Sequence, residues 1–423
     1  MNYRLLTADW LLTCDDSFNI IKNGAIIFES ETNNQNNQYY NKIIEVGTQE
    51  YILEKYDYLN DEYCGKNSVI MPGLINTHVH LELSANKTKL KYGDFVRWLG
   101  SVIKNREELM ENATEQLIDE QLQDMLKSGT TTIGAITSHG FDMNSVMKTP
   151  INAVYFNEII GSQPQMIDTL FADFKAKLEI ANQNKSNSFI PAVAIHSPYS
   201  VHPILIREVL ALAKANKMKI SAHFQESKDE NDWLNYSHGG FADIFKNFLQ
   251  QDKSLTKPSE FLDQFKGIEN LSFVHCVEAN KTELEQIKKL NGSIIHCPVS
   301  NRLLNNSKLE LKHLDGINLA LGTDGLSSNN SLNMFNEMEN ALFVHTQYPL
   351  NKLSNKLIYS ATNGGAKALG LNKGELHSYK DADIIVLTLP DDCEDEQDLA
   401  TMIILHTKYV DKVFIKGNEI ELL

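Results

Sequence analysis

The 423-residue chain contains 42% hydrophobic and 22% charged residues, an ordinary globular composition that is long enough for one large and one small domain. Its 39 Lys and Arg against 55 Asp and Glu give a net charge of −16, which disfavours binding to nucleic acid or to an anionic membrane surface. No apolar run approaches the roughly 20 residues that span a bilayer, the N-terminus lacks signal-peptide features, and the five cysteines form no Cys-x-x-Cys pair. We therefore expect a cytoplasmic protein with reduced thiols.

Both ends of the chain contain short alternating or apolar runs that predict small antiparallel strands. These runs are 11–13, 24–29, 42–47, 381–389 and 409–418. A polar tract over 30–38 predicts a mobile hairpin loop between two of them. We expect the termini, residues 1–68 plus 375–423, to build one small β-sandwich domain, with a catalytic domain over 69–374 inserted between them.

The middle of the chain alternates short apolar runs with stretches of helical periodicity. The runs are 69–76, 131–137, 152–159, 189–195, 219–224, 271–275, 292–296 and 317–322. Eight such units within about 300 residues predict an α/β fold, a (β/α)8 TIM barrel, with a long open sheet as the alternative. A segment over 248–265 reads as an insertion that either covers the barrel mouth or extends a helix outside it.

Polar residues at the ends of these runs favour the barrel over the open sheet. They are His78, His80, His196, His223, His275, His296 and Asp324. The C-terminal ends of barrel strands converge on one mouth, where barrel enzymes place their chemistry, whereas an open sheet would spread these residues along an edge.

The first run ends in His78 and His80, which project from the same face of a strand and can bind one metal ion, usually zinc. Taken singly, His223 could be a core histidine and Asp324 could cap a helix. Three histidines and an aspartate around one mouth are hard to explain without a metal, because unpaired buried polar groups cost free energy.

The residues His78, His80, His223, His275 and Asp324 match, in order, the metal-site pattern of the amidohydrolase superfamily. The resemblance covers nearly the whole chain, including the split β-domain. It implies that His78, His80, His223 and Asp324 hold one divalent ion, zinc or iron, which lowers the pKa of a bound water toward about 7. Two-metal members need a lysine at the fourth strand, and the run 190–197 contains none, so the resemblance implies a mononuclear site.

Three further stretches resemble the nucleoside and base deaminase branch of that superfamily. They are His223–Glu226, His296–Asn301 and Gly322–Asn330. The branch includes S-adenosylhomocysteine/methylthioadenosine deaminases, guanine deaminases and triazine hydrolases. The stretch His80–Thr88, followed by Tyr92–Leu99, most resembles the aminodeoxyfutalosine deaminases of the futalosine route to menaquinone.

Roles for individual residues follow from deamination chemistry and from the resemblance. Glu226 is the candidate proton shuttle, and its presence favours loss of ammonia over loss of chloride. His275 would hydrogen-bond the attacking water, and Asp324 could take its proton while remaining a ligand. His196 resembles a substrate-contacting histidine, whereas His202, beside Pro203, reads as the start of a helix.

Other candidates concern the substrate. Glu107 lies where related deaminases place a ribose-binding carboxylate, although it also reads as an exposed helix residue. Asn301 is expected to shape the pocket. Arg302, Arg97 and Arg106 are candidates for binding a substrate carboxylate, or form surface ion pairs.

The resemblance implies a metal-dependent deaminase that converts the adenine ring of a small nucleoside-like molecule to hypoxanthine with release of ammonia. The expected reaction is 6-amino-6-deoxyfutalosine to futalosine. The alternatives are an S-adenosylhomocysteine/5'-methylthioadenosine deaminase or a guanine deaminase or triazine hydrolase. A non-enzymatic scaffold should have lost ligands, and all are present here. A homodimer is common in the family.

Overall fold

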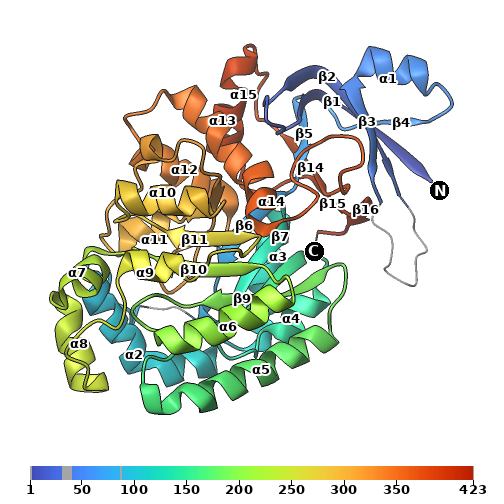
Figure 1. Cartoon of the computed structure of the whole chain (residues 1–423). Coiled ribbons are helices and arrows are strands. Elements are labelled where there is room, and N and C mark those ends of the chain that lie inside the picture. Colours follow the sequence, from blue (N-terminus) through green and yellow to red (C-terminus); the bar gives the residue numbers. More distant parts are fainter. Residues whose placement is uncertain (1, 31–40, 86–87, 423) are drawn as a thin grey trace.

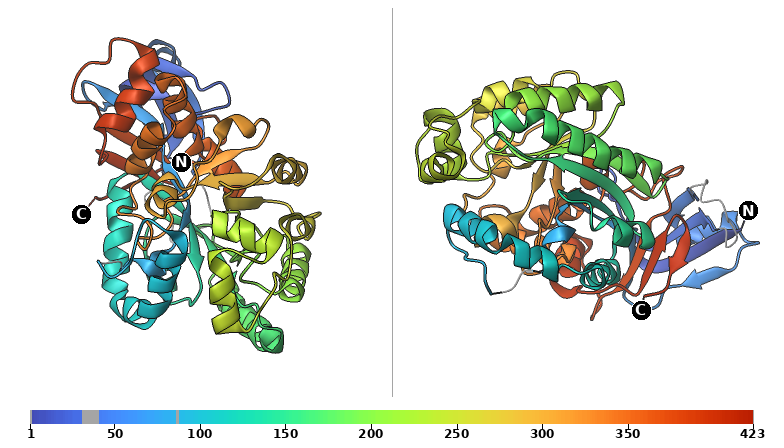
Figure 2. Two further views of the ribbon diagram at one scale, coloured as in Figure 1. Left: turned by 90° about the vertical axis from the view of Figure 1, so that its left-hand side faces the viewer. Right: turned by 90° about the horizontal axis from the view of Figure 1, so that it is seen from below.

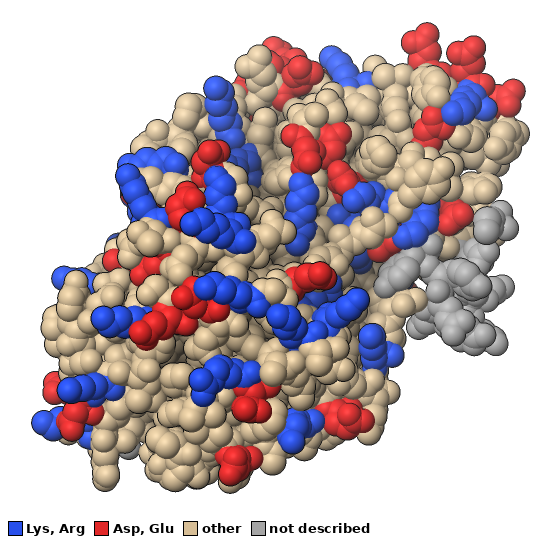
Figure 3. Space-filling model, in the orientation of Figure 1, with Lys and Arg blue, Asp and Glu red and all other residues tan. Residues whose placement is uncertain are grey.

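The computed structural model describes residues 2–30, 41–85 and 88–422, so most of the polar tract expected to form a hairpin loop lies outside the described residues. The chain forms two eight-stranded sheets, one of which is surrounded by helices (Figure 1). None of the described helices is long and apolar enough to cross a membrane. On the face drawn in Figure 3, acidic and basic side chains are interspersed.

The sheet surrounded by helices is parallel throughout, with each strand paired to the next one along the chain. Its strands are β6 (Leu74–Val79), β7 (Thr130–Thr137), β8 (Asn152–Ile159), β9 (Phe189–Ile195), β10 (Ile220–Phe224), β11 (Leu271–His275), β12 (Ser293–His296) and β13 (Leu319–Leu321). The first strand, β6, and the last, β13, close the barrel. Thr77 Oγ1 donates to Leu321 O (2.6 Å), and Asp324 N donates to His78 O (3.0 Å). The predicted (β/α)8 barrel is confirmed.

Helices surround this barrel, most of them on its outer face (Figure 2). They are α2 (Phe95–Asn112), α3 (Glu115–Lys127), α4 (Met143–Lys148), α5 (Ile167–Gln183), α6 (Pro203–Ala215), α7 (Lys228–Tyr236), α8 (Gly240–Leu249), α9 (Pro258–Asp263), α10 (Lys281–Lys289), α11 (Pro298–Leu303), α12 (Met334–Val344), α13 (Leu350–Ser360), α14 (Asn363–Leu369) and α15 (Glu396–His406). Local sequence sets their starts: Asp94 caps α2, Thr114 caps α3 and His202 caps α6 through side-chain acceptors.

One helix lies against the N-terminal ends of the barrel strands. In α14, a Cβ on Gly364 would overlap Leu319 O, and one on Gly365 would lie 2.9 Å from the Cβ of Ile75. Leu369 of the same helix clusters with buried barrel residues such as Phe156. Because α14 packs against this end of the barrel, the opposite, C-terminal ends of the strands form the mouth.

The second sheet is built from both termini, as expected. Its strands are β1 (Tyr3–Leu12), β2 (Ile20–Glu29), β3 (Ile43–Thr48), β4 (Asp61–Tyr63), β5 (Ser68–Pro72), β14 (Ile384–Thr388), β15 (Lys412–Ile415) and β16 (Asn418–Ile420), with α1 (Gln49–Lys55) beside β3. The sheet curls over its own core, since Phe28 of β2 contacts Phe414 of β15 with ring centroids 5.4 Å apart. Strands from opposite ends of the chain therefore face each other, as in a sandwich.

The run 69–76, predicted as one barrel strand, is instead divided between the two sheets. β5 pairs with β1 and β14, and only β6 enters the barrel. The break falls at Gly73, where a side chain would collide with Thr131 of β7. Residue 69 thus lies inside a strand of the terminal sheet, and we propose Gly73 as the domain boundary.

The C-terminal part of the segment 248–265, which contains α9, packs on the outer layer of the barrel. Phe261 of α9 stacks on Phe224 of β10 with ring centroids 5.9 Å apart, and Phe265 packs edge-on against Phe273 of β11 at 5.2 Å. These strand residues alternate with inward-facing neighbours, so the contacts lie on the outside of the barrel.

Candidate active site and metal centre

Four side chains from three strands converge at the mouth of the barrel. The Nε2 atom of His78 lies 3.1 Å from Nε2 of His80 and 3.2 Å from Nε2 of His223. Asp324 Oδ1 lies 3.8 Å from His78 Nε2 and 3.6 Å from His80 Nε2. The strands approach closely enough for this because residue 322 is glycine: a Cβ there would lie 2.8 Å from the Cβ of His78.

These atoms suit a divalent metal ion. Ligands about 2.0–2.1 Å from a tetrahedral zinc ion lie roughly 3.3–3.4 Å from one another, close to the separations of the three imidazoles. Burial, reinforced by the neighbouring imidazoles, lowers the pKa of His223 to about 3 and that of His78 well below its usual value. The rings of His78 and His223 are therefore neutral, and their lone pairs are available to a cation.

Surrounding groups hold the candidate ligands in place. His223 Nδ1 donates to His196 O (2.7 Å), which leaves Nε2 as the free lone pair. Asp324 Oδ2 accepts from the hydroxyls of Ser300 (2.8 Å) and Ser328 (2.9 Å). Asp324 adopts a left-handed conformation with φ 61°, an uncommon state for a residue other than glycine that recurs at functional sites.

A carboxyl and an imidazole face each other beside this cluster. Glu226 Oε1, in the loop after β10, lies 3.5 Å from His275 Nε2 at the end of β11. Burial, together with the carboxylates of Asp324 and Glu230, raises the pKa of Glu226 well above its usual value. Glu230 at the start of α7 fixes this loop by accepting the backbone N–H groups of Gln225 (3.0 Å) and Glu226 (2.8 Å). The site thus places a group that can carry a proton beside the metal ligands.

Asn301 is hydrogen-bonded to His275. The ring atom Nδ1 of His275 lies 3.0 Å from Asn301 Oδ1 and donates to it, so its Nε2, directed towards Glu226, carries the lone pair. Burial lowers the pKa of His275, which keeps the ring neutral. Asn301 therefore orients His275.

His196 and Glu158 lie beside His223 in the wall of the mouth. The His196 ring lies 5.2 Å from that of His223, and its Nδ1 atom is hydrogen-bonded to Ser200 Oγ (2.6 Å). Glu158 at the end of β8 offers a carboxylate oxygen within 4.8 Å of ring nitrogens of both histidines. The prediction from sequence did not include Glu158. A charged residue near the end of the apolar run 152–159 could have indicated a functional side chain at the mouth.

The structure leaves other predicted substrate contacts at the surface. Glu107 is exposed on α2, and Arg302 is exposed on α11, as is Arg97 on α2. Arg106 approaches His139, whose Nε2 lies 3.0 Å from the guanidinium NH2. None of these side chains contacts the His and Asp cluster among the described residues.

A second missed residue is Glu82, buried just after His80. Its Oε1 accepts from Thr137 Oγ1 (2.9 Å) and Gly140 N (2.7 Å), and its Oε2 accepts from Ser138 N (2.8 Å). Glu82 therefore shapes the loop that follows β7 and contains Ser138.

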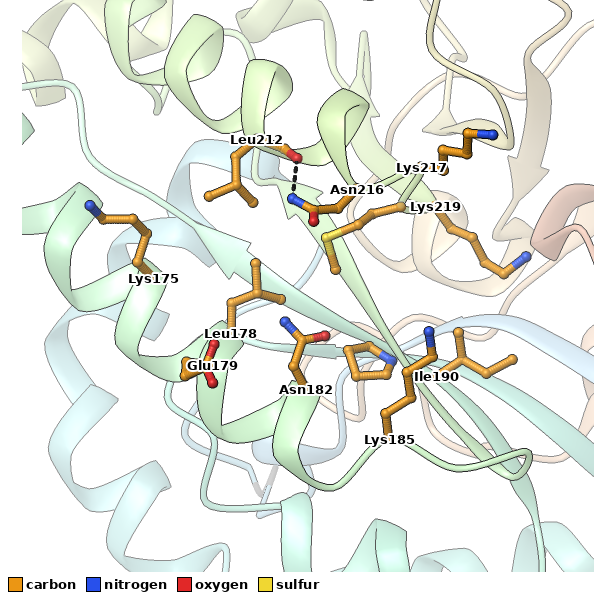
Figure 4. Close-up of a pocket in the computed structure, with 12 residues that line it drawn as sticks. Lys175, Leu178, Glu179, Asn182, Lys185, Ile190, Leu212, Asn216, Lys217 and Lys219 are labelled. Carbon is orange, nitrogen blue, oxygen red and sulfur yellow. Dashed lines mark hydrogen bonds between the residues drawn. The ribbon is translucent and has the colours of Figure 1, made fainter. Parts of the chain in front are cut away.

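The pocket drawn in Figure 4, of about 430 Å³, is separate from this site. It lies between α5 and α6 and includes Ile190 and Lys219, at the N-terminal ends of β9 and β10. His196 and His223 lie at the other ends of these strands, so this pocket cannot serve the mouth.

Residues 69–420 match the amidohydrolase family model. The chain is 43% identical over 378 residues to an aminodeoxyfutalosine deaminase of Nitratiruptor sp., covering 89% of this chain and 93% of that protein. It is 34% identical to an adenosine deaminase of Helicobacter pylori, covering 98% of this chain and 99% of that protein. The crystal structure of Helicobacter pylori aminofutalosine deaminase in complex with methylthio-coformycin is 32% identical, with a TM-score of 0.92 and coverage of 99% of this chain and 100% of that one.

Proposed function

Because the chain belongs to the amidohydrolase family, we propose that it is a metal-dependent deaminase that hydrolyses the 6-amino group of aminodeoxyfutalosine. The products are futalosine and ammonia, which would place the enzyme in menaquinone biosynthesis. The observation that carries the proposal is the pairing of Glu226 and His275 beside the converging His78, His80 and His223. The 43% identity to an aminodeoxyfutalosine deaminase over most of both chains supports the choice of substrate.

In this proposal His78, His80, His223 and Asp324 would hold one divalent ion, zinc by the chemistry of the ligand set. When bound, such an ion acidifies a coordinated water and so supplies a nucleophile at neutral pH. The neutral imidazoles and the two serine hydroxyls on Asp324 prepare the site before a cation arrives.

Deamination also requires proton transfers, which side chains of this protein perform. Water adds to ring carbon six, ring nitrogen one gains a proton, and the amine leaves as ammonia once it is protonated. Glu226, whose raised pKa favours its protonated form, protonates the ring nitrogen. His275 accepts a hydrogen bond from the attacking water through Nε2. Asp324 takes the proton that this water loses and passes it to the departing amine, and the remaining hydroxyl proton returns to Glu226 as the carbonyl forms.

A second candidate is deamination of simpler adenine nucleosides, such as adenosine, 5'-methylthioadenosine or S-adenosylhomocysteine. It is favoured by the 34% identity to an adenosine deaminase and by the 30% identity over 342 residues to a 5'-deoxyadenosine deaminase of Methanococcus vannielii. These substrates share the adenine and ribose but differ beyond carbon five of the sugar.

A substrate panel tests the proposal. The metal-loaded enzyme is assayed on aminodeoxyfutalosine, 5'-methylthioadenosine, S-adenosylhomocysteine, adenosine and guanine by the ultraviolet change as amine becomes carbonyl. We expect the highest kcat/KM with aminodeoxyfutalosine. Equal or faster turnover of the other adenine nucleosides would favour the second candidate, and deamination of guanine alone would contradict both.

A further inference from the structure

We propose that Glu337 on α12 is a positioning residue, which holds the loops after β12 and β13 in the arrangement that metal binding at Asp324 requires. This inference rests on the proposed metal-dependent deamination and adds to it a residue that is not itself a candidate ligand. Glu337 acts through the two serine hydroxyls that donate to Asp324.

Glu337 is buried, and each of its carboxylate oxygens has a donor. The residue is 0% exposed. Its Oε1 accepts from the backbone N–H of Val299 (3.0 Å), and its Oε2 accepts from the side-chain amide of Asn329 (2.8 Å). Val299 is in α11, which follows β12, and Asn329 is in the loop after β13. One side chain therefore joins the chain segments that leave these two neighbouring strands.

The contact with Val299 holds the first turn of α11. This N–H is one of the N-terminal donors that have no partner within a helix, so its acceptor must come from outside. The next two residues are Ser300, whose hydroxyl donates to Asp324 Oδ2 (2.8 Å), and Asn301, whose Oδ1 accepts from His275 Nδ1 (3.0 Å). A displaced α11 would therefore disturb both Asp324 and His275.

The contact with Asn329 acts on the same aspartate. The amide of Asn329 also donates to Thr323 O (2.7 Å), in the residue before Asp324. Ser328, the residue before Asn329, donates its hydroxyl to Asp324 Oδ2 (2.9 Å). Both hydroxyls on this oxygen thus come from residues next in sequence to a partner of Glu337, so loss of the Glu337 carboxylate should loosen both.

The donors that face Glu337 cannot be exchanged for acceptors. A backbone N–H only donates, and the amide of Asn329 is fixed because its Oδ1 accepts from the N–H groups of Asn330 (2.7 Å) and Ser331 (3.1 Å). Both contacts therefore need an acceptor, and a carboxylate supplies one on each oxygen. Glutamine would turn its NH2 group toward one of these donors and break that contact.

The zinc affinity of the folded protein tests this role without relying on activity. We would titrate chelator-treated wild type, Glu337→Gln and the matched control Glu339→Gln with zinc, in competition with a chromophoric chelator. Glu339 is half-buried on the same helix. Burial raises the pKa of Glu337 to about 8, so the titrations are made above that pH. We expect zinc binding about 10–100-fold weaker in Glu337→Gln, and unchanged in Glu339→Gln, because groups behind metal ligands contribute on that order.

Kinetics at saturating zinc give a second readout. Glu337 acts through groups that hold Asp324 and His275, which handle water and protons, and not through the substrate. We expect kcat to fall in Glu337→Gln while KM stays within about threefold of wild type. A higher KM with an unchanged kcat would contradict the assigned role.

Thermal unfolding without zinc separates positioning from a purely structural role. A lower melting temperature of Glu337→Gln with an unchanged zinc dissociation constant would overturn this inference and leave the proposed function intact. If wild-type protein binds no zinc, the proposed function fails and this inference fails with it.

The same unfolding measurement identifies a variant that has not folded. In that case Asn329→Ala replaces Glu337→Gln, because it removes one donor to Glu337 and leaves the contact with Val299. We expect zinc affinity to fall by a smaller factor than the one given for Glu337→Gln. Zinc affinity equal to that of wild type would overturn the proposal.

Discussion

Glu226 and His275 form a pair in which burial acts on two groups in opposite directions. It raises the pKa of the carboxyl and lowers that of the imidazole, which favours the neutral form of each group. A neutral acid beside a neutral base suits a reaction that must add a proton to the ring and remove one from water. Asn301 and Glu230 act one step away, by fixing the ring of His275 and the loop of Glu226.

Glu226→Gln keeps the size of this side chain and removes its transferable proton. Because general acid–base catalysis contributes about 10²–10⁴-fold, we expect turnover to fall by that order while metal content stays unchanged. Steady-state kinetics and metal analysis of the purified variant check both points. Glu285→Gln, the same change at an exposed position on α10, is the control, and a Glu226→Gln enzyme within a few-fold of it would exclude Glu226 as the shuttle.

Among the structural elements, the contact between β13 and β6 brings Asp324 to His78 and His80. It depends on Gly322, where a Cβ would lie 2.8 Å from the Cβ of His78 and 3.0 Å from its backbone N and O. Backbone atoms at that distance cannot move aside without shifting the strand that bears two candidate ligands.

Gly322→Ala should therefore lower both metal content and melting temperature, since it forces the two strands apart. Gly100→Ala on α2 is the matched control: a Cβ there meets nothing within 4 Å, and alanine in a helix is about 0.5–1 kcal/mol more favourable than glycine. Metal analysis and thermal unfolding of the two variants check this. Full metal occupancy in Gly322→Ala would show that the close approach is not needed.

The extent to which sequence predicts this site differs between strands and helices. His78, His80, His223 and Asp324 could be placed together because the ends of parallel barrel strands must meet at one mouth. Helical periodicity identifies a buried face but not the distance of the exposed face from that mouth. The assignment of Glu107, which was made by resemblance, therefore stays a prediction. The run 69–76 was assigned to one barrel strand because an apolar run can continue from one sheet into another.

For the whole molecule, the terminal sheet and the barrel join at the end away from the mouth. Asp383, at the start of β14, accepts from Lys373 Nζ and from Asn152 Nδ2 (3.0 Å) at the start of β8. Both partners of the Lys373–Asp383 pair are buried, and removing one would leave a buried charge unpaired. The contact of Asp383 with Lys373 and Asn152 and the candidate metal centre therefore lie at opposite ends of the barrel strands.

The central claim is that one ion, held by His78, His80, His223 and Asp324, is required for deamination. Chelator-treated protein should be inactive and unfold at a lower temperature, because ligand binding to the native state alone stabilises it. The most direct test is a titration of this protein with zinc, following aminodeoxyfutalosine deamination and bound zinc together. Activity should rise linearly from zero and stop rising at one zinc per chain. Full activity in metal-free protein, or a break at two ions per chain, would contradict it.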